Sequence, residues 1–392
     1  MEALHRFRQR YAKLLMTFLI FIVIPTIAGF AFGYEMGYNK IQLIPTVVAD
    51  YDNSDFSRTL VEYIDDSEVF TVSAYARTDA EAEEMLARGT AMTAVIIPQG
   101  LSADMLSGHA PKIEVLYDGT QMTVASSAKA AMSEILITVK AGYMKNIYEG
   151  KLSEVESQAM NQIMPIDATY RTLFNPAKNY RNFLLPGMLA ALMQVGFAIM
   201  GLVKSMEMRP YFGDSILQDL GTSVLKILVW GFLGAVSLIL CLSIQYAFFD
   251  MPYNGSPAAG LVFTYLFALS TTAFGYVMGQ IIPDKVFATQ LTCVLVLPTS
   301  ILGGYTFPLM AMPEPLQALG KIFPLSYYGD GIRRLCLAKI GFSYFIPDFA
   351  ALLKITGVLV LVLTAVLAAR KLTKRRGETP ADLRPQTGGE AG

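Results

Sequence analysis

Residues 227–249 read ILVWGFLGAVSLILCLSIQYAFF, a run of 23 residues without a charged side chain between Lys226 and Asp250. An α-helix rises about 1.5 Å per residue, so about 20 apolar residues cross the ~30 Å hydrocarbon layer of a bilayer. The run is therefore long enough to span a membrane as a single helix.

Five further stretches meet or nearly meet the same criterion. Charge-free runs cover residues 14–34, 182–203, 251–283 and 286–313, and only Lys354 interrupts residues 349–369. Lys354 lies near one end of its run, where a long aliphatic side chain can extend its ammonium toward the headgroups. We predict a polytopic α-helical membrane protein with six transmembrane helices, at residues 14–34, 182–203, 227–249, 258–282, 286–307 and 349–369.

Basic residues beside the outermost spans indicate the orientation. Residues 1–13 contain four Lys and Arg residues, and residues 370–392 begin with a second basic cluster. Because Lys and Arg accumulate on the cytoplasmic side, both termini are predicted to be cytoplasmic. Residues 35–181 then lie outside; from residue 34 to residue 181 there are 12 basic and 20 acidic residues.

The first apolar run has an alternative interpretation as a cleaved signal peptide, since basic residues precede it. Its 21 residues exceed the apolar core of about 7 to 15 residues that signal peptides use, and no Ala-x-Ala closes it. We therefore expect a retained anchor. Cleavage would leave five spans and the same outside placement of residues 35–181.

Composition excludes several classes of protein. Hydrophobic residues make up 53% of the 392 residues and charged residues only 16%, with a net charge of −1. Soluble domains carry about 25% charge, so neither a soluble enzyme nor a nucleic-acid-binding protein is expected. The three cysteines and two histidines offer no metal site or disulfide framework, because Cys241, Cys293 and Cys336 all lie outside residues 35–181.

Residues 44–118 alternate between short β-rich runs and amphipathic helical runs. Strands are predicted at residues 46–51, 69–74, 92–97 and 113–117. One helix is expected behind Asn53 and Ser54, and a second between the capping box at residues 78–81 and Gly89. This order predicts an α/β extracytoplasmic domain inserted between transmembrane helices one and two.

Residues 121–149 contain no proline and are predicted to form one long helix. We interpret it as a helical stalk that returns the chain to the membrane; the alternative is a third layer packed on the sheet. Asp50 and Asp52 could be an acid/base or metal pair, but turn formation and helix capping explain them better. No catalytic, cofactor-binding or metal-binding residues are assigned.

The five longest spans contain no ionisable side chain, which argues against a proton relay. Their polar groups are neutral, and hydrogen bonding between helices explains them at least as well as a substrate-lining role does. These residues are Gln194, Gln245, Thr271, Thr272, Gln280 and Gln290. Gly29-x-x-x-Gly33 and Gly275-x-x-x-Gly279 offer weak signals for close helix approach.

An energy source for transport is also missing from the sequence. The two Gly-Lys pairs are followed by Leu152 and Ile322, so neither completes a nucleotide-binding loop. The chain is therefore not an ATPase. Two cytoplasmic elements could receive work from a partner: a basic amphipathic helix at residues 1–13 and a polar segment at residues 204–226.

Prolines and glycines break the chain after the fifth span, at Pro298, Gly303-Gly304, Pro308, Pro313, Pro315 and Pro324. These residues cannot share one straight helix. Short helices at or dipping into the outer surface are therefore predicted for residues 308–340.

This region carries a family resemblance. Leu297-Pro298-Thr299-Ser300, Gly303-Gly304, Phe307-Pro308, Met312-Pro313, residues 323–327 (FPLSY) and Arg333 together resemble the C-terminal signature of type-2 ABC exporter permeases. Residues 47–52 (VVADYD) and 95–101 (VIIPQGL) are similar to the subgroup with a large domain after the first helix. With the six-span layout, the resemblance covers roughly residues 10 to 370.

The resemblance implies a permease in a bacterial inner membrane, paired with a second permease and with ABC ATP-binding subunits that bind ATP and Mg. Such families export drugs, lipids or polymer precursors by alternating access. It implies ATPase coupling within residues 204–222, and the charged residues predicted to take part are Glu207, Arg209, Asp214 and Asp219. It also implies an outer gate that contains Pro308, Pro313, Pro324 and Arg333. It implies membrane lipids as further partners and leaves a periplasmic adaptor open; no nucleic acid is expected.

Two alternatives stay open. The first is a non-transporting membrane protein whose extracytoplasmic domain binds a ligand or organises the envelope. The second, an ion-coupled carrier, is disfavoured because the spans contain no carboxylates.

Overall fold

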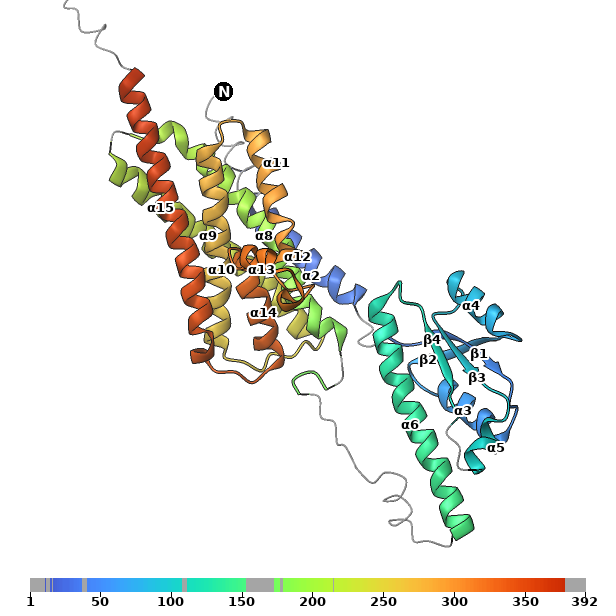
Figure 1. The fold of residues 1–392 in the computed structure, drawn as a ribbon. Coiled ribbons are helices and arrows are strands. Elements are labelled where there is room, and N and C mark those ends of the chain that lie inside the picture. Colours follow the sequence, from blue (N-terminus) through green and yellow to red (C-terminus); the bar gives the residue numbers. More distant parts are fainter. Residues whose placement is uncertain are drawn as a thin grey trace, which may run out of the picture. The chain divides into compact units, whose positions relative to one another are not determined.

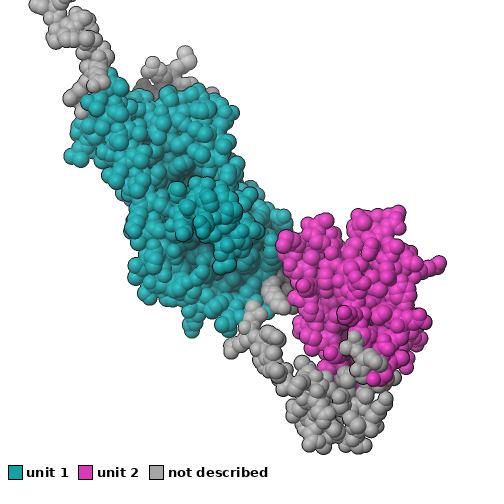
Figure 2. Space-filling view, in the orientation of Figure 1, with its two compact units in different colours: residues 1–37, 173–392 teal, residues 38–172 magenta. Residues whose placement is uncertain are grey.

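The computed structural model describes residues 11, 15, 17–36, 41–107, 111–152, 173–176, 179–213 and 215–377. The chain divides into two compact units (Figure 2): residues 38–172 form one, and residues 1–37 with 173–392 form the other. Three predicted features fall outside the described residues. They are the amphipathic helix at residues 1–13, of which only residue 11 is described, Asp214, and the cytoplasmic tail after residue 377.

The smaller unit is an α/β domain around a four-stranded sheet of order β2-β1-β3-β4 (Figure 1). Strand β1 pairs in parallel with β2 and β3, and β4 pairs antiparallel with β3. The α/β prediction is confirmed, with each strand within two residues of its predicted start. Its elements are β1 (Ile44–Asp50), α3 (Asp55–Asp65), β2 (Phe70–Tyr75), α4 (Asp79–Ala87), β3 (Thr93–Ile97), α5 (Leu101–Leu106), β4 (Glu114–Tyr117) and α6 (Met122–Leu152).

Local sequence signals set the helix ends in this unit. The side chains of Ser54 and Thr78 accept hydrogen bonds from the first-turn amides of Ser57 and Glu81, as N-caps do. Helix α4 ends next to Gly89, whose φ of 71° lies in the left-handed region that glycine adopts without strain. The predicted caps of both helices are therefore confirmed.

Both faces of the sheet are covered. On one face, Val48 and Val95 pack with Leu60 of α3 and Met132 of α6. On the other, Val47 and Ala94 pack with residues of α4, including Ala82. Helix α6 packs against the sheet unit from Val124 to Tyr143, so this part is a layer of the domain, and the stalk interpretation is wrong for it.

The larger unit is a helix bundle (Figure 1). Its elements are the π-helix η1 (Leu19–Val23), α2 (Ile24–Glu35), α8 (Tyr180–Met208), η2 (Arg209–Tyr211), α9 (Ile216–Phe248), α10 (Pro257–Ile281), α11 (Lys285–Val296), α12 (Thr299–Leu302), η3 (Leu309–Ala311), α13 (Glu314–Gly320), α14 (Pro324–Leu337), η4 (Phe342–Phe345) and α15 (Ile346–Gly377).

Five helical stretches among the described residues are long and apolar enough to cross a membrane. They are Tyr180–Tyr211, Ile216–Phe248, Pro257–Ile281, Lys285–Leu302 and Phe342–Thr373. The described part of the first predicted span is shorter, at Leu19–Glu35. These helices agree with a polytopic membrane protein.

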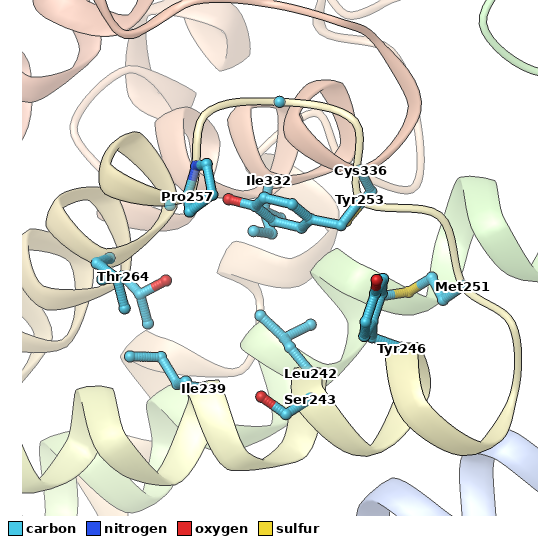
Figure 3. A pocket seen from close by; sticks show the side chains of 13 residues that line it. Ile239, Leu242, Ser243, Tyr246, Met251, Tyr253, Pro257, Thr264, Ile332 and Cys336 are labelled. Atoms are coloured by element: carbon cyan, nitrogen blue, oxygen red, sulfur yellow. The ribbon is translucent and has the colours of Figure 1, made fainter.

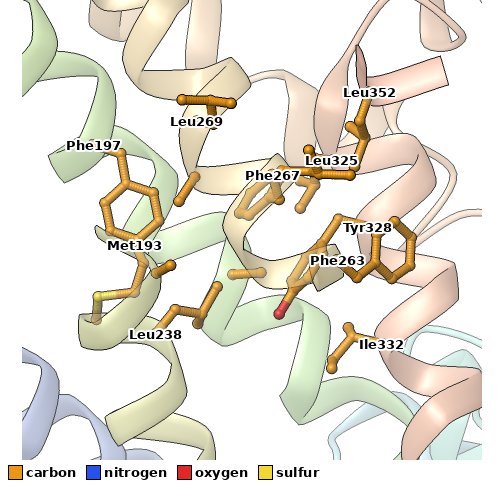
Figure 4. Close-up of a cluster of buried hydrophobic side chains, with 14 of the residues drawn as sticks. Met193, Phe197, Leu238, Phe263, Phe267, Leu269, Leu325, Tyr328, Ile332 and Leu352 are labelled. Atoms are coloured by element: carbon orange, nitrogen blue, oxygen red, sulfur yellow. The ribbon is translucent and has the colours of Figure 1, made fainter. Parts of the chain in front are cut away.

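The core of the bundle is aromatic (Figure 4). The rings of Phe267 on α10 and Tyr328 on α14 stack at 4.4 Å between centroids, and Phe263 meets Tyr328 edge-on. Phe197 of α8 contacts the same Phe267. Since aromatic pairs add to the energy of buried area, this cluster holds α8, α10 and α14 together.

Glycines let two helices approach closely. A Cβ on Gly275 of α10 would lie 1.8 Å from the carbonyl oxygen of Ala198, and one on Gly201 of α8 would lie 2.2 Å from that of Thr272. A Cβ on Gly29 or Gly33 would instead meet a side chain, that of Ile244 at 3.2 Å or that of Phe249 at 2.3 Å. The motif at Gly275 therefore marks a close approach of two helix backbones, and the motif at Gly29 makes room for side chains.

The predicted helix at 286–307 is interrupted. Helix α11 ends at Val296, and Pro298 opens the four-residue α12. Helix α11 runs along the C-terminal half of α10, where Ala288 packs near Met278 and Ile282. Helix α14 runs along the N-terminal half, so two half-length helices are joined by α12 and α13 at mid-height of the bundle (Figure 1).

The structure also differs from the prediction of a separate polar segment at residues 204–226. Residues 204–208 complete α8, and residues 216–226 begin α9. Ser215 is the N-cap of α9 and accepts a hydrogen bond from Gln218 N at 3.4 Å, so α9 begins well before the apolar run at residues 227–249. Only η2 and a short turn separate the two helices.

Candidate functional site

Four helix ends meet at one end of the bundle. The Arg209 guanidinium donates hydrogen bonds to the carbonyl oxygens of Gly279 and Ile282, the latter at 2.6 Å. These carbonyls belong to the last turn of α10 and its C-cap, which leave acceptors unpaired and carry the negative end of the helix dipole. Arg209 therefore caps α10 from the end of α8.

Gln280 connects three helices at the same level. Its Nε2 donates to the carbonyl oxygen of Ser205 on α8 at 3.0 Å, and its Oε1 accepts from Arg370 Nη1 on α15 at 2.8 Å. Arg370 also donates to the Gln280 carbonyl. Gln280 is fully buried, so these bonds satisfy a side chain that would otherwise be costly inside the bundle.

Asp219 joins α9 to α15. Its Oδ2 lies 2.7 Å from Lys371 Nζ, and its Oδ1 accepts from Gly213 N at 3.1 Å. The side chain of Asp219 is 6% exposed and that of Lys371 is 19% exposed. Asp219 therefore stabilises the turn between α8 and α9 through Gly213 and links it to α15 through Lys371.

A chain of hydroxyl groups extends from this pair into the bundle. Ser223 Oγ donates to the Asp219 carbonyl, and the Tyr276 hydroxyl donates to Ser223 Oγ at 3.2 Å. Ser205 Oγ in turn donates to the Tyr276 carbonyl at 2.6 Å. We call Ser205, Arg209, Asp219, Ser223, Tyr276, Gln280, Arg370 and Lys371 the polar clamp.

The four expected coupling residues have different environments. Glu207 is exposed and pairs with Lys204 at 3.0 Å. Arg209 and Asp219 are turned inward as members of the polar clamp. Asp214 lies outside the described residues.

Toward the other end of the bundle, Tyr305 is inserted into α8. Its hydroxyl accepts a hydrogen bond from Gly187 N at 3.1 Å and donates to the Phe183 carbonyl at 3.3 Å. In an uninterrupted helix these two backbone groups would bond each other. The adjacent Pro186 already lacks an amide donor, which explains why α8 accepts the insertion here.

Arg333 of α14 holds Tyr305 in place. Its guanidinium carbon lies 4.1 Å from the Phe183 ring centroid and 4.5 Å from the Tyr305 ring centroid, and its Nη2 donates to the Tyr305 carbonyl at 2.7 Å. A planar guanidinium can make both ring contacts and the hydrogen bond at once. Arg333 thus links α14 to the start of α8.

The expected gate prolines each open a short helix. Pro308 and Pro313 are exposed N-caps of η3 and α13, and Pro324 is the first residue of α14. Proline suits these positions because it has no amide to leave unpaired. Of the expected gate residues, the structure brings Arg333 to Tyr305.

Two cavities lie in the bundle. One, of about 440 Å³, is lined by α9, α10, α14 and the 251–257 loop, with Tyr246, Tyr253 and Thr264 at its wall (Figure 3). Burial raises the pKa of Tyr253 to about 12, so its hydroxyl stays protonated. The other, of about 460 Å³, is lined by Gln194, Thr271 and Thr299 among mainly apolar residues.

The small unit shows no acid/base pair at Asp50 and Asp52. Asp50 accepts from the amides of Asp52 and Asn53 and from Ser57 Oγ, and Asp52 accepts from Ser102 N. Both carboxylates therefore serve turns and caps, as the sequence interpretation favoured. No cluster of three or more metal-ligating side chains occurs among the described residues.

Sequence reasoning missed the roles of Arg370, Lys371, Tyr276 and Tyr305. The basic cluster that contains Arg370 and Lys371 predicts the orientation of the chain but not these contacts. A signal for the contacts lay in Gln280 and Asp219, because polar side chains that are buried need partners. Nothing local distinguishes Tyr305 from the aromatic residues near it in the sequence.

Comparison with known proteins agrees with this architecture. The family model described as "ABC-2 family transporter protein" matches residues 12–366. The chain is 25% identical over 338 residues to "Probable multidrug ABC transporter permease YbhS" of Escherichia coli, which covers 82% of this chain and 84% of that protein. It is 23% identical over 350 residues to "Inner membrane transport permease YhhJ" of the same organism, covering 85% and 86%.

A eukaryotic relative matches a smaller part. "ABC transporter G family member 20" of Dictyostelium discoideum is 26% identical over 228 residues, which cover 56% of this chain and 31% of that protein. The family model spans nearly the whole chain, from residue 12 to residue 366. The chain belongs to the ABC-2 transporter family.

Proposed function

We propose that this chain is the membrane permease subunit of an ATP-driven exporter that moves a hydrophobic or amphiphilic cargo out of the cytoplasm by alternating access. The family match over residues 12–366 carries the proposal. The relatives' names, which include "multidrug" and "inner membrane", support the cargo class and an inner-membrane location.

The work would come from a partner. The sequence does not contain a complete nucleotide-binding loop. An ABC ATP-binding subunit would therefore bind ATP and Mg and hydrolyse the nucleotide. A second permease, like or unlike this one, would complete the pathway. Membrane lipids surround the bundle, and a periplasmic adaptor could contact the α/β unit.

The basic end of the bundle supports a cytoplasmic placement of the polar clamp. Arg209, Arg370 and Lys371 gather there, and Lys and Arg favour the cytoplasmic side. Both termini would then be cytoplasmic and the α/β unit extracytoplasmic. This places the α8–α9 turn where a cytoplasmic ATPase reaches it.

The polar clamp would transmit motion of that turn. Asp219 and Lys371 tie the turn to α15, and Arg209 ties α8 to the end of α10. A displacement at residues 212–215 therefore cannot occur without moving or breaking these contacts. Glu207, which is exposed on α8, would contact the partner directly.

Reconstitution tests the proposal. The chain is coexpressed with candidate ATP-binding subunits, purified in detergent and placed in liposomes with a fluorescent amphiphile. We expect an ATPase to copurify and ATP to drive dye movement, and we expect a partner without its catalytic carboxylate to support neither hydrolysis nor transport.

Two results would contradict the proposal. One is transport by the purified chain alone, without any nucleotide hydrolase. The other is full function of residues 38–172 expressed as a soluble protein, which would favour the non-transporting alternative.

A further inference from the structure

The 460 Å³ cavity has a mainly apolar wall with a few polar side chains. It lies between α8, α10, α12, α15 and the start of α14, and residues such as Phe274, Phe323 and Val358 make its wall mainly apolar. Four polar side chains line it: Gln194, Thr271, Thr299 and Lys354.

Three of these polar groups are already engaged within the protein. Thr299 Oγ1 donates to the Val296 carbonyl at 2.7 Å and accepts from Gln194 Nε2 at 2.9 Å. Thr271 Oγ1 donates to the Phe267 carbonyl at 2.9 Å. They fix the shape of the wall and add little capacity to bind a charged ligand.

Lys354 is different. No ion pair or hydrogen bond joins its ammonium to any other described residue, whereas the basic residues of the polar clamp all have partners. The described helices around the cavity contribute no carboxylate to its lining. The exposed Lys354 therefore adds an uncompensated positive charge at the open side of the cavity.

The cavity lies at mid-height of the bundle and opens at its surface, where Lys354, Ile322 and Val358 are exposed. Gln194 and Thr271 are each the fifteenth residue of their helices, about 21 Å along α8 and α10 at the rise of an α-helix. The sequence predicts that Lys354 extends toward the headgroups. In the structure Lys354 lines the same cavity as Gln194 and Thr271. Ionisable side chains at such depth usually have a functional partner.

We propose that this cavity is a cargo-binding site for an amphiphilic anion, whose acidic group pairs with Lys354 and whose apolar body occupies the cavity. The inference rests on the proposed function and specifies its substrate class. Charge complementarity selects the acidic group, and the phenylalanine and aliphatic wall selects the apolar body.

The volume favours a single-chain or compact molecule over a bilayer lipid. Small-molecule sites measure about 300 to 1,000 Å³, and this cavity falls at the lower end of that range. The occupant is therefore a discrete amphiphile that enters the site from solution or from the membrane.

Binding of a matched pair of probes tests the inference. The full-length chain is placed in phosphatidylcholine nanodiscs and titrated with 11-(dansylamino)undecanoic acid or its methyl ester, with empty nanodiscs as the blank. We expect Lys354→Met to weaken binding of the acid by about tenfold or more, since a charge-assisted contact is lost, and to leave the ester within about twofold.

Two variants serve as controls. Lys354→Arg retains the positive charge and should restore binding of the acid. Lys339→Met removes an exposed lysine that does not line the cavity and should change neither probe.

Several outcomes would overturn the inference. They are equal binding of acid and ester by the unmodified protein, an equal loss for both probes in Lys354→Met, and displacement of the acid by phosphatidylglycerol in the nanodisc. The last result would make an anionic lipid the occupant.

A transport assay separates this inference from the proposed function. ATP-driven movement of a neutral amphiphile by Lys354→Met, with loss of the acid, supports both. If neither probe moves with any ATP-binding subunit, the exporter proposal fails while the binding data still report on the cavity.

Discussion

The Tyr305 hydroxyl accepts a hydrogen bond from Gly187 N at 3.1 Å, at a point where α8 would otherwise bond to itself. The contact joins two residues 118 positions apart in the chain. The contact makes the loop after α12 part of the structure of α8.

We expect Tyr305→Phe to lower the free energy of unfolding by about 1 to 3 kcal/mol, because it leaves buried backbone groups of α8 without a partner. Gly187→Ala should be at least as harmful, since its Cβ would lie 2.1 Å from Tyr305 Cε2. Thermal unfolding in detergent, followed by circular dichroism, measures both. Tyr246→Phe, at an exposed tyrosine, is the control; an unchanged melting temperature for Tyr305→Phe would contradict the insertion.

Arg333→Lys should destabilise the protein by about 2 kcal/mol although it preserves the charge, because an ammonium cannot stack on two rings and donate to a carbonyl at the same time. The neighbouring Arg334→Lys affects exposed contacts with Asp330 and Tyr344 and should cost about 1 kcal/mol or less. Resistance to denaturation by a titrated detergent compares the two. Equal losses would show that the ring contacts of Arg333 contribute nothing specific.

The Asp219–Lys371 pair should behave as a buried ion pair. Asp219→Asn or Lys371→Met alone leaves one buried charge uncompensated, at a cost of about 3 to 5 kcal/mol. The double substitution should recover most of that loss, and a double-mutant cycle on unfolding midpoints measures the coupling. Additive losses would show that the two side chains do not interact.

The same substitutions test the polar clamp in function. If the clamp transmits work, Asp219→Asn/Lys371→Met should fold yet uncouple ATP hydrolysis by the partner from transport. Arg88→Met, which breaks an exposed pair in the α/β unit, should leave coupling intact.

Two glycine substitutions compare close packing with open space. Gly275→Ala places a Cβ 1.8 Å from the Ala198 carbonyl oxygen and should separate α8 from α10, at a cost of about 1 to 3 kcal/mol or failure to fold. Gly196→Ala, on α8, meets nothing within 4 Å and should be neutral or slightly stabilising. Hydrogen exchange of α8 and α10 amides reports the separation even when the total yield is low; equal protection in both variants would contradict close packing.

The α/β unit shows how far local signals reach. Alternation, caps and turn residues predicted its strands and helices because each signal acts within a few residues along the chain. The packing of α6 could not be predicted in this way: Met132 and Val139 mark an apolar stripe, but the stripe does not reveal whether it faces a sheet or another surface.

By itself, the sequence determined that this protein is a bundle of long apolar helices with an α/β unit after the first, because length and hydrophobicity decide how a segment partitions into a membrane. Only the tertiary structure decided that α11 and α14 are two half-length helices along α10, that Tyr305 enters α8, and that Asp219 meets Lys371. These contacts join residues far apart in the chain, and a hydrogen bond or ion pair forms only where the packing of several helices places both partners. The spacing of residues within one segment carries no information about that placement.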